Sequence, residues 1–377
     1  MDFEFSEEQQ ILRSALGQFC QRQYGFDARM TAARSQPGFR AEIWRALADD
    51  LGILGATIGE RHGGMGGGAI EQMIVMEEVG RSLILEPLSE TLFQAAPLLE
   101  QGGGAQIAAT LSAVIAGRSI LALAIAEPEI GYDLADIGMV AERSGNGWSL
   151  TGRKSVVMAA PWADRLIVAA RTAGSAGDRD GISLFLVPTA SAGIRMQSYK
   201  TIDERRAADI DFDAAQIEGD ALIGGEGDGF ELLEAWRDRA IAAQAAEAVG
   251  LLDRLVSETV AYTKQREQFG QPIAAFQSLQ HRMVDMWIQV ELVRAASVKA
   301  ALALTADARE RSKAASAAKV TLAEACRFVG QSAVQLHGGM GMTDELVIGH
   351  LFKRATLLEI EHGTADWHVA RLADQLA

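Results

Sequence analysis

The segment Tyr262–Met286 carries an arginine, a glutamine and an aromatic side chain where two helical patterns meet. The first pattern stops near Arg266, a Gly-x-Pro turn follows, and a new helix is expected to begin near Phe276. Side chains of these types on a turn can hold a phosphate, an amide edge and a flat ring. Taken alone, an interhelical turn with a surface arginine explains the same residues equally well.

A carboxylate in an apolar helix is the second feature that could do chemistry. The only polar side chains of the stretch AIAAQAAEAVGLL are Gln244 and Glu247, which are three residues apart and so share one face of a helix. An ionised carboxylate in such a helix costs several kcal/mol unless a partner or a function retains it. Glu247 is therefore expected to be either an active group or one half of a buried ion pair.

The sequence shows no other motif of dinucleotide or metal chemistry. Gly224–Phe230 lacks the third glycine of a dinucleotide fingerprint and follows a strand of an antiparallel region, so a plain connection to the next helix is expected. The six histidines have no zinc-ligand spacing, and no metal site is predicted. Cys20 and Cys326 are expected to be reduced core thiols.

Length, charge and hydropathy limit the class of protein. A chain of 377 residues is expected to form two or three domains. Its net charge of −15 argues against a general nucleic-acid binder, but a bound nucleotide needs only a few local cations and helix N-termini. The acidic N-terminus is not typical of a secretory signal and no apolar run reaches about 18 residues, so a cytoplasmic protein that does not enter the membrane is expected.

The elements that must position these residues fall into three blocks. Helical periodicity covers the first block, short aliphatic runs separated by turn residues predict antiparallel strands from about 119 to 220, and helical periodicity returns after Gly229. The expected domains are 1–117, 118–222 and 223–377. Helices are expected at 6–24, 38–51, 69–82, 86–99 and 104–116, and then at 230–263, 274–304, 308–337, 344–359 and 364–376.

Several long motifs of the chain resemble the acyl-CoA dehydrogenase family. The pattern YxxxRxQFGxPIxxFQxxxHxxxDM of Tyr262–Met286 is similar to a signature of that family, and QLHGGMGM (Gln335 to Met342) is similar to its second flavin signature. EQQILRSALGQFC, ERHGGMGG and LTGRKSVVMAAPWADRLIVAART extend the resemblance over the whole chain. The resemblance implies an α+β fold with a helical N-terminal domain, a middle β-barrel domain and a C-terminal four-helix bundle that also forms the dimer interface.

The cofactor and the reaction are implied by the same resemblance. It implies FAD-dependent α,β-dehydrogenation of an acyl-CoA thioester to the 2-enoyl-CoA. In the family the arginine and phenylalanine of RxQFG and the QxxGG segment hold the FAD of the neighbouring subunit, and a Gly-Thr near the C-terminus also touches FAD. The residues that match these positions are Arg266, Phe269, Gln335, Gly338, Gly339, Gly363 and Thr364.

The middle block departs from the family pattern in two places. The usual flavin and thioester loop T-E-P-x-x-G-S-D is here AEPEIGYD (126–133), so a threonine and a serine hydroxyl are gone. The W-I-T of a flavin-facing strand falls on Val156-Val157-Met158, which removes an aromatic ring and another hydroxyl. Three consequences stay open: FAD held differently, held more weakly, or held partly by a partner subunit.

The resemblance leaves the α-proton base open. Many family members use the glutamate of E-G-T, but here His362 fills that slot and Glu361 comes one residue early, a shift of about 100° on a helix. A subgroup associated with bulky, steroid-like acyl-CoA substrates resembles the DRA-x(5)-AEA-x-G pattern of this chain, and it uses the glutamate that matches Glu247. We expect Glu247 to be the base, with Glu361 as the alternative. In a third possibility Glu247 is a buried structural pair and this subunit has no base; Glu359 is expected to be an exposed helix residue.

Partners follow from the resemblance as well. It implies electron-transfer flavoprotein as the electron acceptor, although an oxygen-reducing oxidase would look similar at this level. The expected assembly is a homodimer or homotetramer, or a heterotetramer with a paralogue. The alternative to an autonomous enzyme is a non-catalytic or half-site subunit of a heteromeric acyl-CoA dehydrogenase. The altered middle block favours that alternative, and the retained Arg266, QLHGG and Glu247 oppose it.

Overall fold

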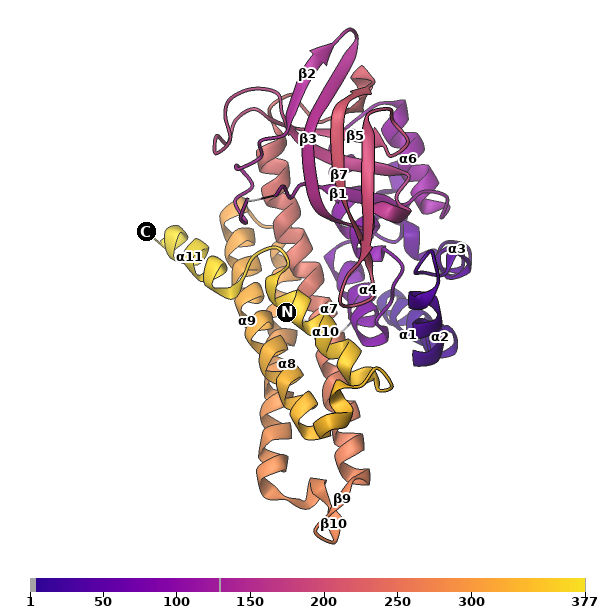
Figure 1. Cartoon of the computed structure of the whole chain (residues 1–377), viewed down its shortest axis with the longest axis vertical. Coiled ribbons are helices and arrows are strands. Elements are labelled where there is room, and N and C mark those ends of the chain that lie inside the picture. Colours follow the sequence, from indigo (N-terminus) through magenta and orange to yellow (C-terminus); the bar gives the residue numbers. More distant parts are fainter. Residues whose placement is uncertain (1–4, 129, 377) are drawn as a thin grey trace. The chain divides into compact units, whose positions relative to one another are not determined.

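The computed structural model describes residues 5–128 and 130–376 of the chain. These residues form two compact units (Figure 1). The first, called here the helical unit, holds the described residues of Met1–Met30, Ala69–Ile84 and Asp238–Ala377. The second, called the sheet unit, holds Thr31–Gly68 and Leu85–Arg237.

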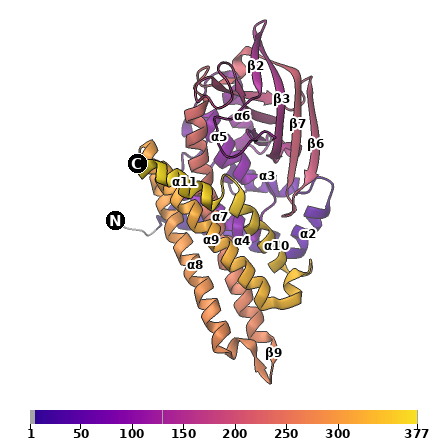
Figure 2. The ribbon, with the colours of Figure 1, turned by 60° about the vertical axis from the view of Figure 1, so that its left-hand side comes forward.

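Long helices dominate the helical unit. Helix α1 (Glu7–Gln23) begins at Ser6, whose hydroxyl accepts from the Gln9 backbone while the Gln9 side chain accepts from the Ser6 backbone, a capping box. The later helices closely follow the periodicity of the sequence, and α8 and α9 run alongside one another in Figure 2. The remaining helices of this unit are α4 (Ala69–Ser82), α7 (Gly229–Gln265, from Asp238 onward), α8 (Gln277–Ala303), α9 (Ala308–His337), α10 (Val347–Ile360) and α11 (Ala365–Leu376).

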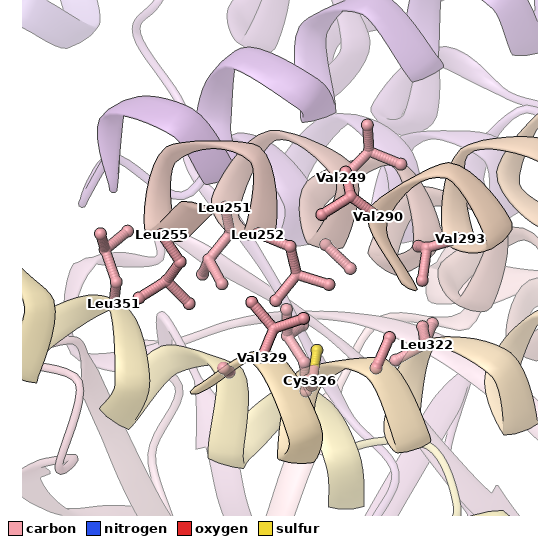
Figure 3. Close-up of a cluster of buried hydrophobic side chains, with 14 of the residues drawn as sticks. Val249, Leu251, Leu252, Leu255, Val290, Val293, Leu322, Cys326, Val329 and Leu351 are labelled. Carbon is pink, nitrogen blue, oxygen red and sulfur yellow. The ribbon is translucent and has the colours of Figure 1, made fainter. Parts of the chain in front are cut away.

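The core of the helical unit is an aliphatic cluster shared by helices α7 to α10. Side chains from all four meet there, and they include Leu252, Val290, Val329 and Leu351 (Figure 3). Cys326 lies in the same cluster as a free thiol, and Cys20 is also free and buried, so the prediction of reduced core thiols is confirmed. Burial raises the pKa of the Cys326 thiol to about 12, which keeps it protonated and unreactive.

Helices α4 and α7 touch backbone to backbone near the candidate base. A Cβ added to Gly80 would collide with the carbonyl of Glu247, and one added to Gly250 would collide with the carbonyl of Glu77. Only glycine allows helices to approach this closely. The pair of glycines therefore fixes the stretch of α7 that carries Glu247 against α4.

A sheet of eight strands forms the centre of the sheet unit. Its order is β6-β7-β3-β2-β4-β5-β8, with β1 paired to β4. The strands are β1 (Leu121–Ala124), β2 (Val140–Ser144), β3 (Gly147–Met158), β4 (Arg165–Arg171), β5 (Ile182–Pro188), β6 (Ile194–Lys200), β7 (Arg206–Ile217) and β8 (Leu222–Ile223). The expectation of antiparallel strands is wrong where β4 pairs with β1 and with β2. Both pairs are parallel, because β3 carries the chain back across the sheet before β4 begins.

Smaller elements complete the two units. The helix expected at 86–99 is a π-helix, η3 (Ser89–Ala95), followed by α5 (Ala96–Leu99), and Gly224–Asp228 simply connects β8 to α7 as predicted. The other helices are α2 (Phe26–Arg34), α3 (Ala41–Asp49), α6 (Ala105–Ile115), η1 (Ile53–Gly55), η2 (Glu60–His62), η4 (Ala160–Trp162) and η5 (Gly219–Ala221). Within the described residues, no helix is both long enough and apolar enough to cross a membrane.

Candidate active site

The Arg266 segment forms an exposed hairpin at one end of the helical unit. Helix α7 ends at Gln265, strands β9 (Glu267–Gln268) and β10 (Gln271–Pro272) pair, and helix α8 follows after η6 (Ile273–Ala275), as the sequence predicts (Figure 1). Phe269 sits at the tip with a φ of 56° and is 91% exposed. A non-glycine residue in the left-handed region with an exposed aromatic ring is uncommon, which makes Phe269 a candidate contact for a ligand.

A stacked pair ties this hairpin to the second glycine-rich motif. The ring of Tyr262, one turn before the hairpin, stacks on His337 at 4.3 Å between centroids, and its hydroxyl donates to the His337 carbonyl at 3.4 Å. Burial lowers the pKa of His337, so its ring is neutral against the tyrosine. His337 ends α9, and η7 (Gly338–Met342) follows it. The ends of α7 and α9 therefore carry the two motifs side by side.

The residues at this end fit a nucleotide cofactor with a flat ring. The guanidinium of Arg266 makes no hydrogen bond or ion pair with the residues that the structure describes. A Cβ added to Gly338 or Gly339 would meet nothing within 4 Å, so the backbone of these two residues is uncovered. Gln335 is exposed on the last turn of α9. A cation for a phosphate, a ring for stacking and uncovered backbone groups suit the FAD that the sequence implies.

Thr364 lies elsewhere. It follows α10, whose 14 residues separate it from η7 by about 20 Å of helix. Its hydroxyl accepts from the Trp367 backbone at 3.3 Å and so caps α11. The structure thus brings five of the predicted cofactor residues to one end of the helical unit and leaves Thr364 beside the carboxylates.

Glu247 and Glu361 share one arginine. Arg354 Nε and Nη2 donate to the two oxygens of Glu247 at 2.5 and 2.8 Å, and both side chains are buried. Arg354 Nη1 and Nη2 also donate to the two oxygens of Glu361 at 2.8 and 3.3 Å. Each carboxylate is thus held by two N–H groups of one guanidinium, an arrangement that fixes geometry as well as charge. The two candidate bases, 114 residues apart in the sequence, form a single site.

Gln244 and Lys319 complete this cluster. Gln244 Nε2 donates to Glu361 Oε2 at 2.8 Å, and Lys319 Nζ donates to Gln244 Oε1 at 3.3 Å. Lys319 also donates to the carbonyls of Leu358 and Glu361, each at 2.5 Å. Burial lowers the pKa of Lys319 to about 8, and the Glu361 carboxylate opposes this shift by raising the pKa.

The turn after Glu361 has little conformational freedom. His362, which fills the slot of the family's glutamate, has a φ of 62°, and its carbonyl lies 3.0 Å from His368 Nε2. A Cβ on Gly363 would lie 2.6 Å from the same nitrogen, and Gly363 has a φ of 120°. Glycine is therefore required there. The buried His368 anchors the turn from the side of α11.

Sequence reasoning missed two cations of the site and misjudged one carboxylate. Lys319 is the lone charge in the small-residue stretch AASAAKVTLA, which is the same signal that singled out Glu247, whereas nothing near Arg354 distinguished it from its neighbour Lys353. Glu359 was expected to be exposed, and this is wrong: its side chain is 13% exposed, and Arg327 Nε donates to it at 3.0 Å.

The altered loop of the sheet unit is organised by its own ion pair. Glu127 accepts from the backbones of Gly138 and Met139 and from the buried Lys154 Nζ at 2.7 Å, and burial lowers the pKa of Lys154 to about 8. Residue 129 of this loop lies outside the described residues. On β3, Val156 is exposed with a φ of 51°, an outlier for a β-branched residue.

Comparisons with known proteins agree with the resemblance. The N-terminal, middle and C-terminal domains of acyl-CoA dehydrogenases match residues 6–118, 122–215 and 227–377. The chain is 30% identical to acyl-CoA dehydrogenase FadE12 of Mycobacterium tuberculosis over 94% of this chain and 92% of that protein. It is 28% identical to the caffeyl-CoA reductase-Etf complex subunit CarC of Acetobacterium woodii, over 96% of both chains.

A solved structure shares the whole fold. The ChsE4-ChsE5 complex from Mycobacterium tuberculosis contains a chain that superposes with a TM-score of 0.89 at 26% identity, covering 100% of this chain and 99% of that one. The expected α+β fold with helical, β-barrel and helical-bundle domains is thereby confirmed. The chain belongs to the acyl-CoA dehydrogenase family of FAD-dependent oxidoreductases.

Proposed function

We propose that the protein binds FAD and dehydrogenates an acyl-CoA thioester to the 2-enoyl-CoA, with Glu247 as the α-proton base. The observation that carries this proposal is the buried cluster in which Arg354 holds Glu247 and Glu361 together. A carboxylate is the group able to take the α-proton, because burial and neighbours can tune its proton affinity. When bound, FAD supplies the acceptor for the hydride that leaves the β-carbon.

The second carboxylate, Glu361, keeps Arg354 paired when Glu247 is protonated. Once Glu247 takes up a proton it is neutral, and a buried guanidinium without a partner costs several kcal/mol. Glu361 already accepts from Arg354 Nη1 and Nη2, so the arginine stays paired throughout the transfer. The arrangement therefore lets Glu247 change charge without leaving an isolated cation, and Glu361 serves as its counter-partner. The reverse assignment, with Glu361 as base, uses the same logic and is the alternative to be tested.

The remaining roles follow the retained motifs. We assign the FAD contacts to Arg266, Phe269, Gln335, Gly338, Gly339 and Thr364, and the substrate to the bulky, steroid-like acyl-CoA class because of the DRA-x(5)-AEA-x-G pattern. Electron-transfer flavoprotein is the proposed electron acceptor, and the relative CarC belongs to a complex with that protein.

An oligomer is part of the proposal. The side chains of Val284, Trp287, Ile288 and Leu292 are exposed at helical spacing along α8. An apolar stripe of this length is typical of a helix that packs against another subunit. The exposed Arg266 hairpin lies at one end of the same helix and would reach a neighbouring subunit's cofactor.

A half-site subunit is the second candidate function. The AEPEIGYD loop and Val156 replace hydroxyls and an aromatic ring of the family pattern, and the similar ChsE4-ChsE5 structure is a complex of two different chains. In this case a paralogue supplies what this chain lacks, and the assembly is a heterotetramer.

Colour and anaerobic bleaching separate the two functions. The protein purified alone is incubated with FAD, separated from unbound FAD by gel filtration, and titrated without oxygen with butyryl-CoA, palmitoyl-CoA and cholyl-CoA. An autonomous enzyme is yellow and loses its flavin absorbance with at least one of these thioesters, most strongly with the bulky one. A protein that stays colourless until a paralogue is co-expressed is a half-site subunit.

A further inference from the structure

Lys319 is a buried cation to which the proposed reaction assigns no step. It is 0% exposed on α9, inside the cluster that carries both carboxylates. Its three N–H groups meet three oxygens, those of the Leu358 and Glu361 carbonyls and of the Gln244 amide. A buried lysine needs this many partners to retain its charge. All three partners belong to the segments that hold Glu361.

The ammonium determines which way the Gln244 amide points. Gln244 Oε1 faces the Lys319 donor, so Gln244 Nε2 must face Glu361, where it donates to Oε2 at 2.8 Å. A reversed amide would set its NH2 group against the ammonium and its oxygen against the carboxylate. Both contacts would be repulsive. A charge on α9 therefore orients a donor on α7 toward the carboxylate that follows α10.

The ammonium also holds the backbone from which Glu361 extends. The carbonyls of Leu358 and Glu361 lie at the C-terminal end of α10, where the last carbonyls of a helix lack partners within it. A cation is favourable at this end because it meets the negative pole of the helix. Glu361 is the residue that leads into the strained turn at His362 and Gly363. The bond from Lys319 to its carbonyl therefore ties the start of this turn to α9.

We propose that Lys319 is a positioning residue of the active site, which directs the Glu361 carboxylate onto Arg354 through the amide of Gln244 and the turn at the end of α10. Lys319 touches no reacting group under this proposal. It keeps Glu361 available as the second partner of Arg354 while Glu247 changes charge. The inference deepens the proposed function and rests on it for its catalytic consequence, but not for the positioning itself.

Loss of a proton from the Lys319 ammonium would break its contact with Gln244. A neutral amine has two N–H groups and a lone pair, so one of the three oxygens loses its donor, and the Gln244 contact is the longest. Burial brings the pKa of Lys319 to about 8, and the groups that act on it are Glu361, Cys326, Arg354 and Glu359. Of these, Arg354 lowers the pKa and the other three raise it, while Glu247 and Gln244 face the cluster from α7.

Backbone amide exchange of the whole purified protein tests the positioning without reference to activity. The reporters are the amides of Glu361, Gly363 and His368, whose hydrogen bonds close the turn. Lys319→Met keeps the volume of the side chain and removes its donors. We expect these amides to exchange about tenfold faster in the variant than in the wild type, because one net hydrogen bond is lost at each of two carbonyls.

Arg311→Met is the matched control. Arg311 lies on the same helix two turns earlier and pairs with Asp238 at 3.2 Å. Asp238 also pairs with Arg371, and this second pair remains in the variant. This variant removes a cation of α9 without touching the Glu361 turn, so the three reporter amides should keep their wild-type rates. Wild-type rates in Lys319→Met as well would overturn the proposal.

The pH profile of flavin reduction tests the catalytic consequence. With cholyl-CoA under anaerobic conditions, the wild type and Arg311→Met should both lose rate as the pH rises through about 8, while Lys319→Met and Gln244→Met should be slower and flat there. Gln244→Met covers the case in which Lys319→Met fails to fold. An inflection retained in both cluster variants would overturn the proposal. If no thioester reduces the wild-type flavin, the proposed function fails, and the exchange rates still decide the role of Lys319.

Discussion

The two regions that carry the chemistry of this chain are built in opposite ways. The cofactor end presents Arg266 and the 91% exposed Phe269 on a hairpin, with no partner for the guanidinium among the described residues. The carboxylate cluster buries Glu247, Arg354 and Lys319, and every one of these groups is bonded. An exposed, unpaired site is completed by what binds to it, whereas a buried, fully paired site must change internally in order to act. Substitutions should therefore affect binding at the first site, and rate and stability at the second.

The largest effect is expected for the base itself. Glu247→Gln removes the proton acceptor and keeps the shape, so anaerobic reduction of the flavin by cholyl-CoA should slow by about a thousandfold, within the range for loss of a general base, while FAD stays bound. Stopped-flow absorbance measures this rate. Glu361→Gln is the matched control, since it makes the same change on the other carboxylate of Arg354, and it should cost far less.

The rates of Glu247→Gln and Glu361→Gln also decide between the alternative assignments of the base. A severe loss in Glu361→Gln with a mild one in Glu247→Gln would reverse the assignment of base and counter-partner. Equal, wild-type rates in both variants would mean that a different subunit supplies the base. The half-site function would then be the better account of this chain.

Removing the shared arginine should destabilise the fold strongly. Arg354→Met leaves two carboxylates facing each other with one partner lost, and breaking a buried ion pair in this way costs about 3–5 kcal/mol. Urea unfolding followed by circular dichroism measures the loss. Arg327→Met breaks the more exposed pair with Glu359 and should cost at most about 1 kcal/mol. Equal losses would contradict the view that the buried cluster is a single network.

The exposed region should show the converse pattern. Arg266→Ala should weaken FAD binding by about 10- to 100-fold, as expected for the loss of a charged hydrogen bond, and leave the urea midpoint unchanged. Fluorescence titration of the apoprotein with FAD measures the affinity. Lys264→Ala removes a cation two residues earlier that is also exposed; it is the control and should bind FAD normally. A loss of stability without a loss of affinity would show that the hairpin is structural.

The contrast also explains what the sequence could predict. The Arg266 hairpin is a local motif: its residues are neighbours in the chain, so its turn, its position between α7 and α8 and its exposure follow from short-range chemistry. Glu247 was singled out because a carboxylate in an apolar helix needs a reason. Its partner could not be named, because Arg354 reaches it from α10, more than a hundred residues away, and Glu361 joins the cluster from the end of the same helix.

The same limit applied to the sheet unit. The strands were recognisable from their aliphatic runs, but the parallel pairing of β1 with β4 depends on how the hairpin β2–β3 folds back, which no local pattern encodes. Pairing between distant elements is decided by tertiary packing. For both units, the sequence specified the elements well and their long-range partners poorly.

The most gradual predicted effect lies in the pH dependence of stability, and its sign separates global stability from local positioning. Lys319 has a pKa of about 8 in the folded protein and an ordinary value of 10.5, so between these values the unfolded chain holds a proton that the folded chain has released. Stability must therefore rise with pH across this window, by at most about 1.4 kcal/mol per pH unit. The urea midpoint of the wild type, compared with that of Lys319→Met at the two ends of the window, measures the slope. Lys154, with the same lowered pKa, is present in both proteins and cancels in the difference.

We expect the urea midpoint of the wild type to rise relative to that of Lys319→Met as the pH increases, because only the wild type gains stability when Lys319 releases its proton. The same proton loss should weaken the hold on Gln244, because a neutral amine has only two donors for three oxygens. A protein that becomes more stable while its Glu361 turn becomes looser would show that this lysine is retained for the geometry of the site, at a cost to the fold. A falling difference would mean that the ammonium stabilises the fold, and that its contacts outweigh the desolvation that lowers its pKa.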